Sequence, residues 1–286
     1  MATSSGFVLV HGSFHDHHTW QFVTPLLEKA GHSVVAIDLP GSGKYASYPS
    51  SYLLRPIDSE LFSVEPSPNA DVTQEERTEA VISTVRELNA STGCKAVLVG
   101  HSLGGLTALH VAETIPEELS AVVFLSSLLL SYNMKPADLL AHESMARRLV
   151  PQLYYGDYVK TGVMRIDPRS EDDQYQKLVK ESFYEDVSEE RFRQILAFLS
   201  PDEPAQVLFV PSPVTKSRFG TVPRYYIHCL QDKAIPIETQ REVVELMDTA
   251  MENETITFSL NTSHSPFYSK PEELAAILNQ IADEND

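Results

Sequence analysis

The sequence predicts an α/β fold, in which a mostly parallel central sheet is covered by helices on both faces. Short, continuous apolar runs recur along the chain, and such runs are typical of strands buried on both faces. Segments with helical spacing separate most of these runs, and this alternation favours a parallel sheet. Polar residues follow several of the runs directly, which is where an open parallel sheet builds its sites.

The first part of the chain alternates strand and helix. The runs Phe7–Val10 and Ser33–Asp38 predict two buried strands. Between them, the apolar spacing from Trp20 to Ala30 predicts a helix that ends at Gly31. Short connections of this kind are expected in a compact α/β domain.

Residues 44–72 interrupt this alternation, because they contain four prolines and no clear hydrophobic period. We expect a long loop there, which is either a plain surface excursion or part of the rim of a pocket. Thr73 and Glu76 are then placed as a capping box that begins the next helix.

The segment Ala96–Gly105, AVLVGHSLGG, predicts the central buried strand and the start of a helix over 103–115. Ser102 therefore lies on a sharp strand-to-helix turn. Gly100 and Gly104 suit such a turn, because it leaves no room for side chains at those two positions. The turn raises the serine hydroxyl above the sheet edge and directs the first helix amides toward it.

The remaining strands are expected further along the chain, at 121–125, 223–230 and 255–260. Ser269 and Glu272 are placed as a capping box for the closing helix, with Pro271 in its first turn.

The alternation of strand and helix stops at residues 131–216, which we call the insertion. They carry helical patches at 136–149 and 175–183 but no strand–helix alternation. We expect a core formed by residues 1–130 and 217–286, with the insertion as a mainly helical cap over the site. The alternative is that the insertion only stabilises the fold.

Composition limits the classes of partner. The 286-residue chain has 22 basic and 40 acidic residues and a net charge of −18, which argues against nucleic acid or an anionic membrane surface. Cys94 and Cys229 are expected to be free thiols. The N-terminal segment has no basic stretch before its short apolar run, and no apolar run approaches the roughly 18 residues needed to span a bilayer. We therefore expect a cytoplasmic protein.

The run His15-Asp16-His17-His18 raises the possibility of a metal site. Adjacent residues point in different directions, and no cysteine or spaced carboxylate completes a ligand set. We expect no bound metal and interpret His15 and His18 as pocket-lining or solvated residues.

Three polar residues follow predicted strand ends in the order Ser102, Asp232, His264. Serine can act as nucleophile, histidine as the base that takes its proton, and aspartate as the group that orients the imidazole. The order is the one in which triads of this fold class are arranged. We therefore predict a catalytic triad.

The motifs HGSFHDHHTW, GHSLGG, QDKAIP and TSHSPFYSKPEEL resemble the α/β-hydrolase superfamily across nearly the full length. The resemblance is to the branch of plant methyl esterases, hydroxynitrile lyases and bacterial pyrethroid-type carboxylesterases. It implies the same triad and places the oxyanion-binding amides at Ser13 and Leu103, with Phe14 as an alternative to Ser13. We also expect four residues to line the substrate pocket, namely Phe14, His15, His101 and Tyr154.

The lyases of this branch carry a threonine and a lysine where this chain has Gly12 and Ser265, so hydrolysis is favoured. The expected activity is cofactor-independent hydrolysis of a medium-sized hydrophobic carboxylic ester or lactone. The expected partner is that small molecule, with no nucleic acid and no membrane, while the oligomeric state stays open, a homodimer included. The alternatives are lyase or cofactor-free oxygenase chemistry on the same fold, or a hydrolase-like ligand receptor.

Overall fold

The structure is a computed structural model that describes residues 5–285. Six parallel strands form one sheet in the order β2-β1-β3-β4-β7-β8, which confirms the predicted α/β class. The strands are β1 (Gly6–Val10), β2 (Ser33–Ile37), β3 (Ala96–His101), β4 (Leu119–Leu125), β7 (Arg224–Cys229) and β8 (Ile256–Leu260). The expectation of a cytoplasmic protein rests in part on residues 1–4, which lie outside the described residues.

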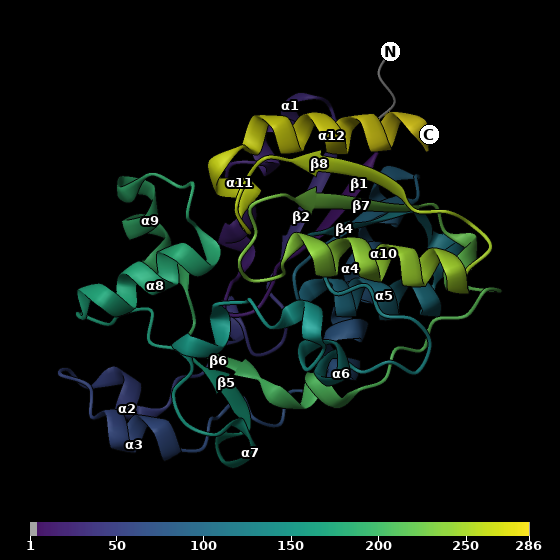
Figure 1. Cartoon of the computed structure of the whole chain (residues 1–286). Coiled ribbons are helices and arrows are strands. Elements are labelled where there is room, and N and C mark those ends of the chain that lie inside the picture. Colours follow the sequence, from purple (N-terminus) through teal and green to yellow (C-terminus); the bar gives the residue numbers. More distant parts are fainter. Residues whose placement is uncertain (1–4, 286) are drawn as a thin grey trace.

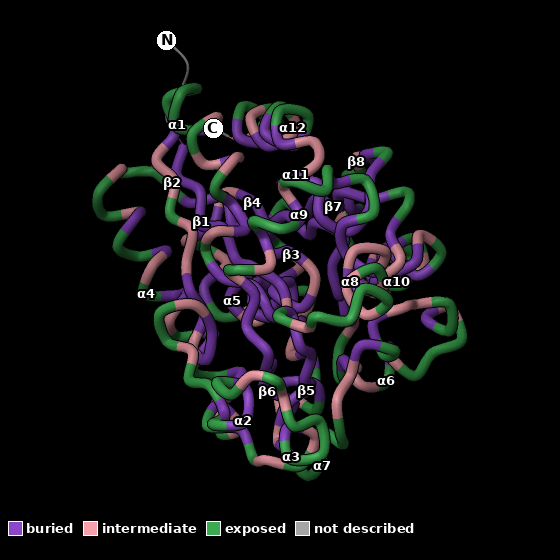
Figure 2. The backbone as a smooth tube through the Cα atoms, turned by 90° about the vertical axis from the view of Figure 1, so that its left-hand side faces the viewer, coloured by how far each residue is buried: buried purple, intermediate pink, exposed green. Residues whose placement is uncertain are grey.

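Helices cover both faces of this sheet (Figure 1). One face carries α1 (Thr24–Lys29) and α12 (Pro271–Glu284). The other carries α4 (Gln74–Thr92), α5 (Gly104–Thr114) and α10 (Ile237–Ala250). Figure 2 shows the result, with β1, β3 and β4 running as buried strands through the middle of the molecule. No helix in the described part of the chain is both long and apolar enough to cross a membrane.

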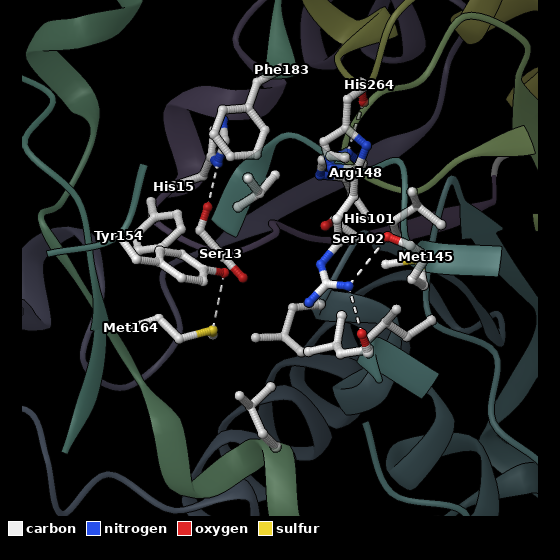
Figure 3. A pocket seen from close by; sticks show the side chains of 18 residues that line it. Ser13, His15, His101, Ser102, Met145, Arg148, Tyr154, Met164, Phe183 and His264 are labelled. Carbon is white, nitrogen blue, oxygen red and sulfur yellow. Dashed lines mark hydrogen bonds between the residues drawn. The ribbon is translucent and has the colours of Figure 1, made fainter. Parts of the chain in front are cut away.

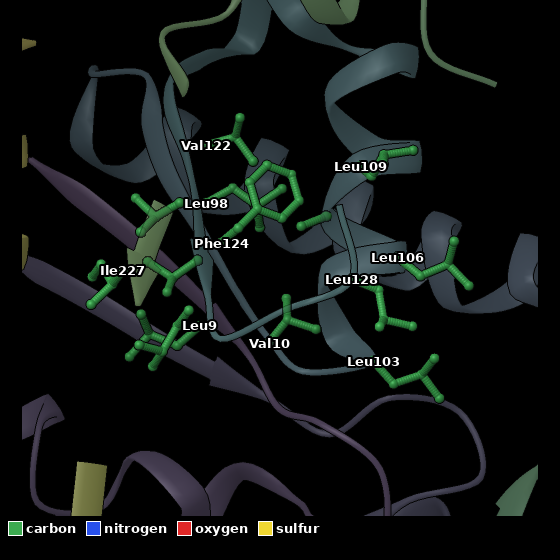
Figure 4. Close-up of a cluster of buried hydrophobic side chains, with 14 of the residues drawn as sticks. Leu9, Val10, Leu98, Leu103, Leu106, Leu109, Val122, Phe124, Leu128 and Ile227 are labelled. Atoms are coloured by element: carbon green, nitrogen blue, oxygen red, sulfur yellow. The ribbon is translucent and has the colours of Figure 1, made fainter. Parts of the chain in front are cut away.

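The core is built where the central strands meet α5 (Figure 4). Leu98, Val122 and Phe124 are fully buried, and Leu106 and Leu109 on α5 are buried as well. Each such side chain contributes about 1.5–3 kcal/mol through burial of its apolar surface. The sheet that presents the site is therefore a rigid support.

Some helix boundaries differ from the sequence-based expectation. The helix predicted from Trp20 to Ala30 is a 3-10 turn over His17–Trp20 followed by α1, because a proline at the start of α1 is tolerated only in a first turn. The Thr73 capping box of α4 is confirmed. The capping box at Ser269 is wrong, since Ser269 ends a separate short helix, α11 (Pro266–Ser269), and its hydroxyl contacts Thr262.

The 44–72 segment is not a plain loop, because it contains α2 (Ser50–Leu53) and α3 (Ser59–Val64). It packs against the insertion through Arg165, whose guanidinium forms two hydrogen bonds to the Asp202 carboxylate and also donates to backbone carbonyls of 62 and 65. The side chain of Arg165 is fully buried. A buried guanidinium with this many acceptors fixes the two segments together.

The insertion lies to one side of the sheet, with α8 and α9 next to each other in Figure 1. Its helices are α6 (Pro136–Leu140), α7 (Tyr158–Thr161), α8 (Asp173–Phe183) and α9 (Glu189–Ile195). It also holds a short antiparallel pair, β5 (Val163–Arg165) and β6 (Asp202–Pro204), which the sequence pattern did not indicate. The helix expected over 136–149 ends at 140 and is followed by short 3-10 turns. Both cysteines are free, Cys94 exposed and Cys229 buried.

The close packing at the turn after β3 predicts a large cost for a single methyl group. A Cβ at Gly104 would lie 2.2 Å from the His11 carbonyl oxygen, which is backbone and cannot move aside cheaply. We expect Gly104→Ala to lower the free energy of unfolding by about 1–3 kcal/mol, measured by urea denaturation. The matched control is Gly220→Ala, where the nearest atom would be 3.4 Å away and the expected change is within about 0.5 kcal/mol. Equal effects of the two substitutions would contradict this reading.

Candidate active site

Ser102 occupies the turn between β3 and α5 at the carboxyl edge of the sheet. Its φ of 52° is in the left-handed region, which costs energy for a residue with a side chain. The turn is held from both sides, since the Ser102 N–H donates to the Leu125 carbonyl (3.2 Å) and the Ser102 carbonyl accepts from the Ser127 hydroxyl (2.6 Å). The strained conformation is therefore held by the end of β4 and the segment that follows it.

Asp232 and His264 form a buried pair. The distance between His264 Nδ1 and Asp232 Oδ2 is 2.6 Å. The other carboxylate oxygen accepts from the backbone N–H groups of Ala234 (2.7 Å) and Ile235 (2.9 Å), and the Ser126 hydroxyl donates to Oδ2. A carboxylate oxygen accepts hydrogen bonds, so the N–H of His264 that faces Asp232 is assigned to Nδ1, and Nε2 is left to accept a proton.

Ser102 and His264 line the same cavity, but no direct hydrogen bond joins the hydroxyl to the imidazole. The bond between a nucleophile and its base is often long until a substrate is bound. His101 supports His264, because its Nε2 lies 3.0 Å from the His264 carbonyl oxygen and the two rings are 4.5 Å apart.

The loop after β1 brings Ser13 to the same cavity as Leu103. Neither of their N–H groups forms a hydrogen bond to another described residue. The Phe14 N–H, the alternative donor, already donates to Glu203 Oε2 at 3.2 Å, so the structure disfavours that alternative. Glu203 is buried and paired with Arg77 at 2.5 Å, which holds its carboxylate in place beside the loop.

His15 also holds this loop. Its Nδ1 lies 2.6 Å from the Ser13 carbonyl oxygen, and its Nε2 lies 2.6 Å from the Tyr184 hydroxyl. Burial lowers the pKa of His15 to about 3, so the ring is neutral at pH 7. The neutral ring therefore donates from Nδ1 to Ser13 and accepts from the tyrosine.

The cavity beside Ser102 has a volume of about 60 Å³ and lies between the core and the insertion (Figure 3). The expected pocket residues Phe14, His15, His101 and Tyr154 are all among its lining residues. The 44–72 segment supplies none of the lining. The insertion contributes mostly apolar side chains, among them Leu140, Met145, Val150, Met164, Phe183 and Leu208, together with Arg148.

Residues 7–277 match the family model described as the alpha/beta hydrolase family. The chain belongs to this family. Methylesterase 1 of Arabidopsis thaliana is 29% identical to this hydrolase over 97% of the chain and 95% of the relative, and salicylic acid-binding protein 2 of Nicotiana tabacum is 28% identical over 99% and 98%. A pyrethroid hydrolase from Sphingobium faniae has the same fold, with a TM-score of 0.75, 24% identity and 98% of each chain covered. These likenesses agree with the branch named from the sequence motifs.

One result differs from the expectation for the histidine run. The ligand atoms of Asp16, His17 and His18 lie within 4.8 Å of one another, although adjacent side chains were expected to diverge. Both Nδ1 atoms are already engaged, His17 with Asp38 at 2.8 Å and His18 with Asp16 at 3.0 Å. None of these residues lines the cavity of the hydrolase.

The sequence reasoning missed several residues that shape this site. Ser126 follows β4 directly, so the rule that found the other polar residues after strand ends also applies to it. Glu203 and Tyr184 reach the loop after β1 from the insertion, 189 and 169 residues away along the chain. No local sequence pattern predicts contacts between residues so far apart along the chain.

Buried neutral histidines predict that acid destabilises the folded hydrolase. Burial lowers the pKa values of His11, His15 and His101 below that of an exposed histidine. Below pH 6.5 the unfolded chain binds protons that the folded chain does not, so the free energy of unfolding falls with decreasing pH. Each of these histidines contributes up to about 1.4 kcal/mol per pH unit, and for His15 the window extends from pH 6.5 to about 3.

Urea denaturation at pH 7.5, 6.5 and 5.5 measures this effect above the range in which carboxyl groups titrate. For His15→Gln, the free energy of unfolding should fall less steeply with decreasing pH than for the wild type, by up to about 1.4 kcal/mol per pH unit. An unfolding free energy that is constant from pH 6.5 to 5.5 would disprove the buried neutral state.

Proposed function

We propose that this hydrolase is a cofactor-independent serine carboxylesterase with Ser102, Asp232 and His264 as its triad. The observation that carries the proposal is the 2.6 Å Asp232–His264 pair, whose histidine lines the same cavity as a serine on a strained turn. The names of its relatives, methylesterases and a pyrethroid hydrolase, support ester-bond hydrolysis.

In the proposed reaction, Ser102 Oγ bonds to the ester carbonyl carbon while His264 Nε2 takes the hydroxyl proton. The carbonyl oxygen becomes an oxyanion and accepts hydrogen bonds from the Ser13 and Leu103 N–H groups. As the ester C–O bond breaks, His264 returns the proton to the leaving alkoxide, which departs as the alcohol. Water then attacks the acyl-enzyme with the same base, and the acid and free Ser102 are formed.

The apolar side chains around the cavity support a hydrophobic ester or lactone as the substrate. A cavity of about 60 Å³ holds the reacting group and a short chain. A medium-sized substrate therefore requires side chains of the insertion to move, and Met145 and Met164 are flexible enough to do so. A cytoplasmic location and a small molecule as the main partner remain predictions.

A fluorophosphonate label tests the nucleophile directly. We expect the wild-type protein to gain one stoichiometric adduct on Ser102 by intact-mass spectrometry, and Ser102→Ala and His264→Ala to gain none, because only a base-activated serine reacts. The exposed Ser59→Ala variant, folded like the wild type, should label normally. Absence of an adduct on folded wild-type protein would refute the serine mechanism.

Steady-state hydrolysis of methyl and p-nitrophenyl esters provides a second test. Ser102→Ala should lose roughly 10⁴-fold or more in kcat while keeping its melting temperature. If His264→Ala is inactive but Ser102→Ala loses little, the chemistry is proton abstraction, as in the lyase or oxygenase alternative.

A further inference from the structure

Arg148 is the one arginine or lysine among the 18 residues that line the cavity. It comes from the insertion and is partly buried. Its Nη1 donates to the Leu140 carbonyl at 2.5 Å and to the Met145 carbonyl at 3.3 Å. Figure 3 shows the guanidinium among the lining side chains, with both hydrogen bonds running to backbone oxygens.

No aspartate or glutamate lines this cavity, and Arg148 has no ion-pair partner in the described part of the chain. The three arginines that are buried, unlike the partly buried Arg148, each pair with a carboxylate. Arg77 pairs with Glu203, Arg165 with Asp202, and Arg224 with Asp248.

The remaining donors of Arg148, Nε and Nη2, bond to no described group and are not sealed from solvent. Burial lowers the pKa of Arg148, but a guanidinium keeps its charge at neutral pH. A charge held in an apolar cavity without a counterion is unfavourable unless a ligand supplies one.

Tyr154 is a second polar side chain of this cavity, and besides burial the Arg148 charge acts on the pKa of its hydroxyl. Its side chain also lines the cavity, and its hydroxyl lies 3.4 Å from the Met164 sulfur, a weak acceptor. Burial raises the pKa of Tyr154 to about 12, so the hydroxyl stays protonated and can donate. Arg148 and Tyr154 therefore supply hydrogen-bond donors to a lining that is otherwise mostly apolar.

We infer that Arg148, together with Tyr154, binds a free carboxylate on the substrate, so that the ester carries a second, anionic carboxyl group. The inference rests on the proposed esterase function, but it replaces the hydrophobic ester as substrate with short monoesters of dicarboxylic acids, whose carbon chain still contacts the apolar lining. The planar guanidinium matches a carboxylate in two parallel hydrogen bonds, and one cation balances one negative charge. This cation lies in a cavity of a chain whose net charge is −18. The cavity volume of about 60 Å³ favours a short chain.

Two esters that differ only in this charge test the inference, monomethyl glutarate and dimethyl glutarate, with methanol release measured by gas chromatography. We expect the wild type to prefer the monoester in kcat/KM by at least about tenfold, after correction for the two ester groups of the diester. Arg148→Met should lower that preference by about 10–100-fold. Arg147→Met, at the exposed neighbouring position, is the matched control and should keep the wild-type preference.

A purely structural role for Arg148, capping the carbonyls of 140 and 145, predicts a different result. In that case Arg148→Met would change both esters alike, which would overturn the inference, as would a wild-type preference for the diester. If Arg148→Met does not fold, Arg148→Gln replaces it, since glutamine still donates to a carbonyl but carries no charge.

Binding to Ser102→Ala by calorimetry separates this inference from the proposed function. Monomethyl glutarate should bind at least about tenfold more tightly than the diester, and the added Arg148→Met change should remove the difference. This readout holds even if neither ester is hydrolysed, which would count against the esterase function alone. Equal binding of the two esters to Ser102→Ala would overturn the carboxylate site.

Discussion

The close approach of α5 to the loop after β1 is the constraint on which the rest of the site depends. Gly104 passes so near the His11 carbonyl that no side chain fits between them, and Gly12 is similarly close to the Ser102 side chain. This contact places two backbone segments, one from each side of the nucleophile, against the same cavity. Any residue larger than glycine at these positions would move the amides apart, and the proposed oxyanion site would lose its geometry.

Buried charge pairs hold the outer segments to this centre. Arg165 ties the insertion to the 44–72 segment, and Arg77 on α4 reaches Glu203 on β6. Such pairs add little net stability compared with apolar packing, but removing one partner leaves an uncompensated charge. These pairs therefore favour one position of the insertion relative to the rest of the chain. Arg148 stands apart from this pattern, because its neighbours are carbonyls and apolar side chains.

The sequence predicted the sheet, the turn and the three polar residues after strand ends, because each depends on local signals. A buried parallel strand needs a continuous apolar run, and a sharp turn needs glycines at fixed offsets, as around Ser102. The structure brings Asp232 and His264 together as a pair, as the sequence led us to expect. The sequence could not predict the roles of Glu203 and Arg148, since nothing in the pattern of the insertion indicates which of its side chains face the site. The capping box at Ser269 failed for a related reason, because a tertiary contact with Thr262 engages its hydroxyl.

The hydrogen bond from the Phe14 amide to Glu203 has a mechanical consequence. It joins the loop that carries Ser13 to β6, and β6 belongs to the insertion. The position of β6 therefore helps to set that of the Ser13–Phe14 peptide, whose carbonyl is also contacted by the His15 ring. The loop beside the nucleophile is thus held largely by the insertion, since Tyr184 and Ser200 contact it as well. The wall of the cavity and the position of the loop that carries Ser13 therefore depend on the same segment of the chain.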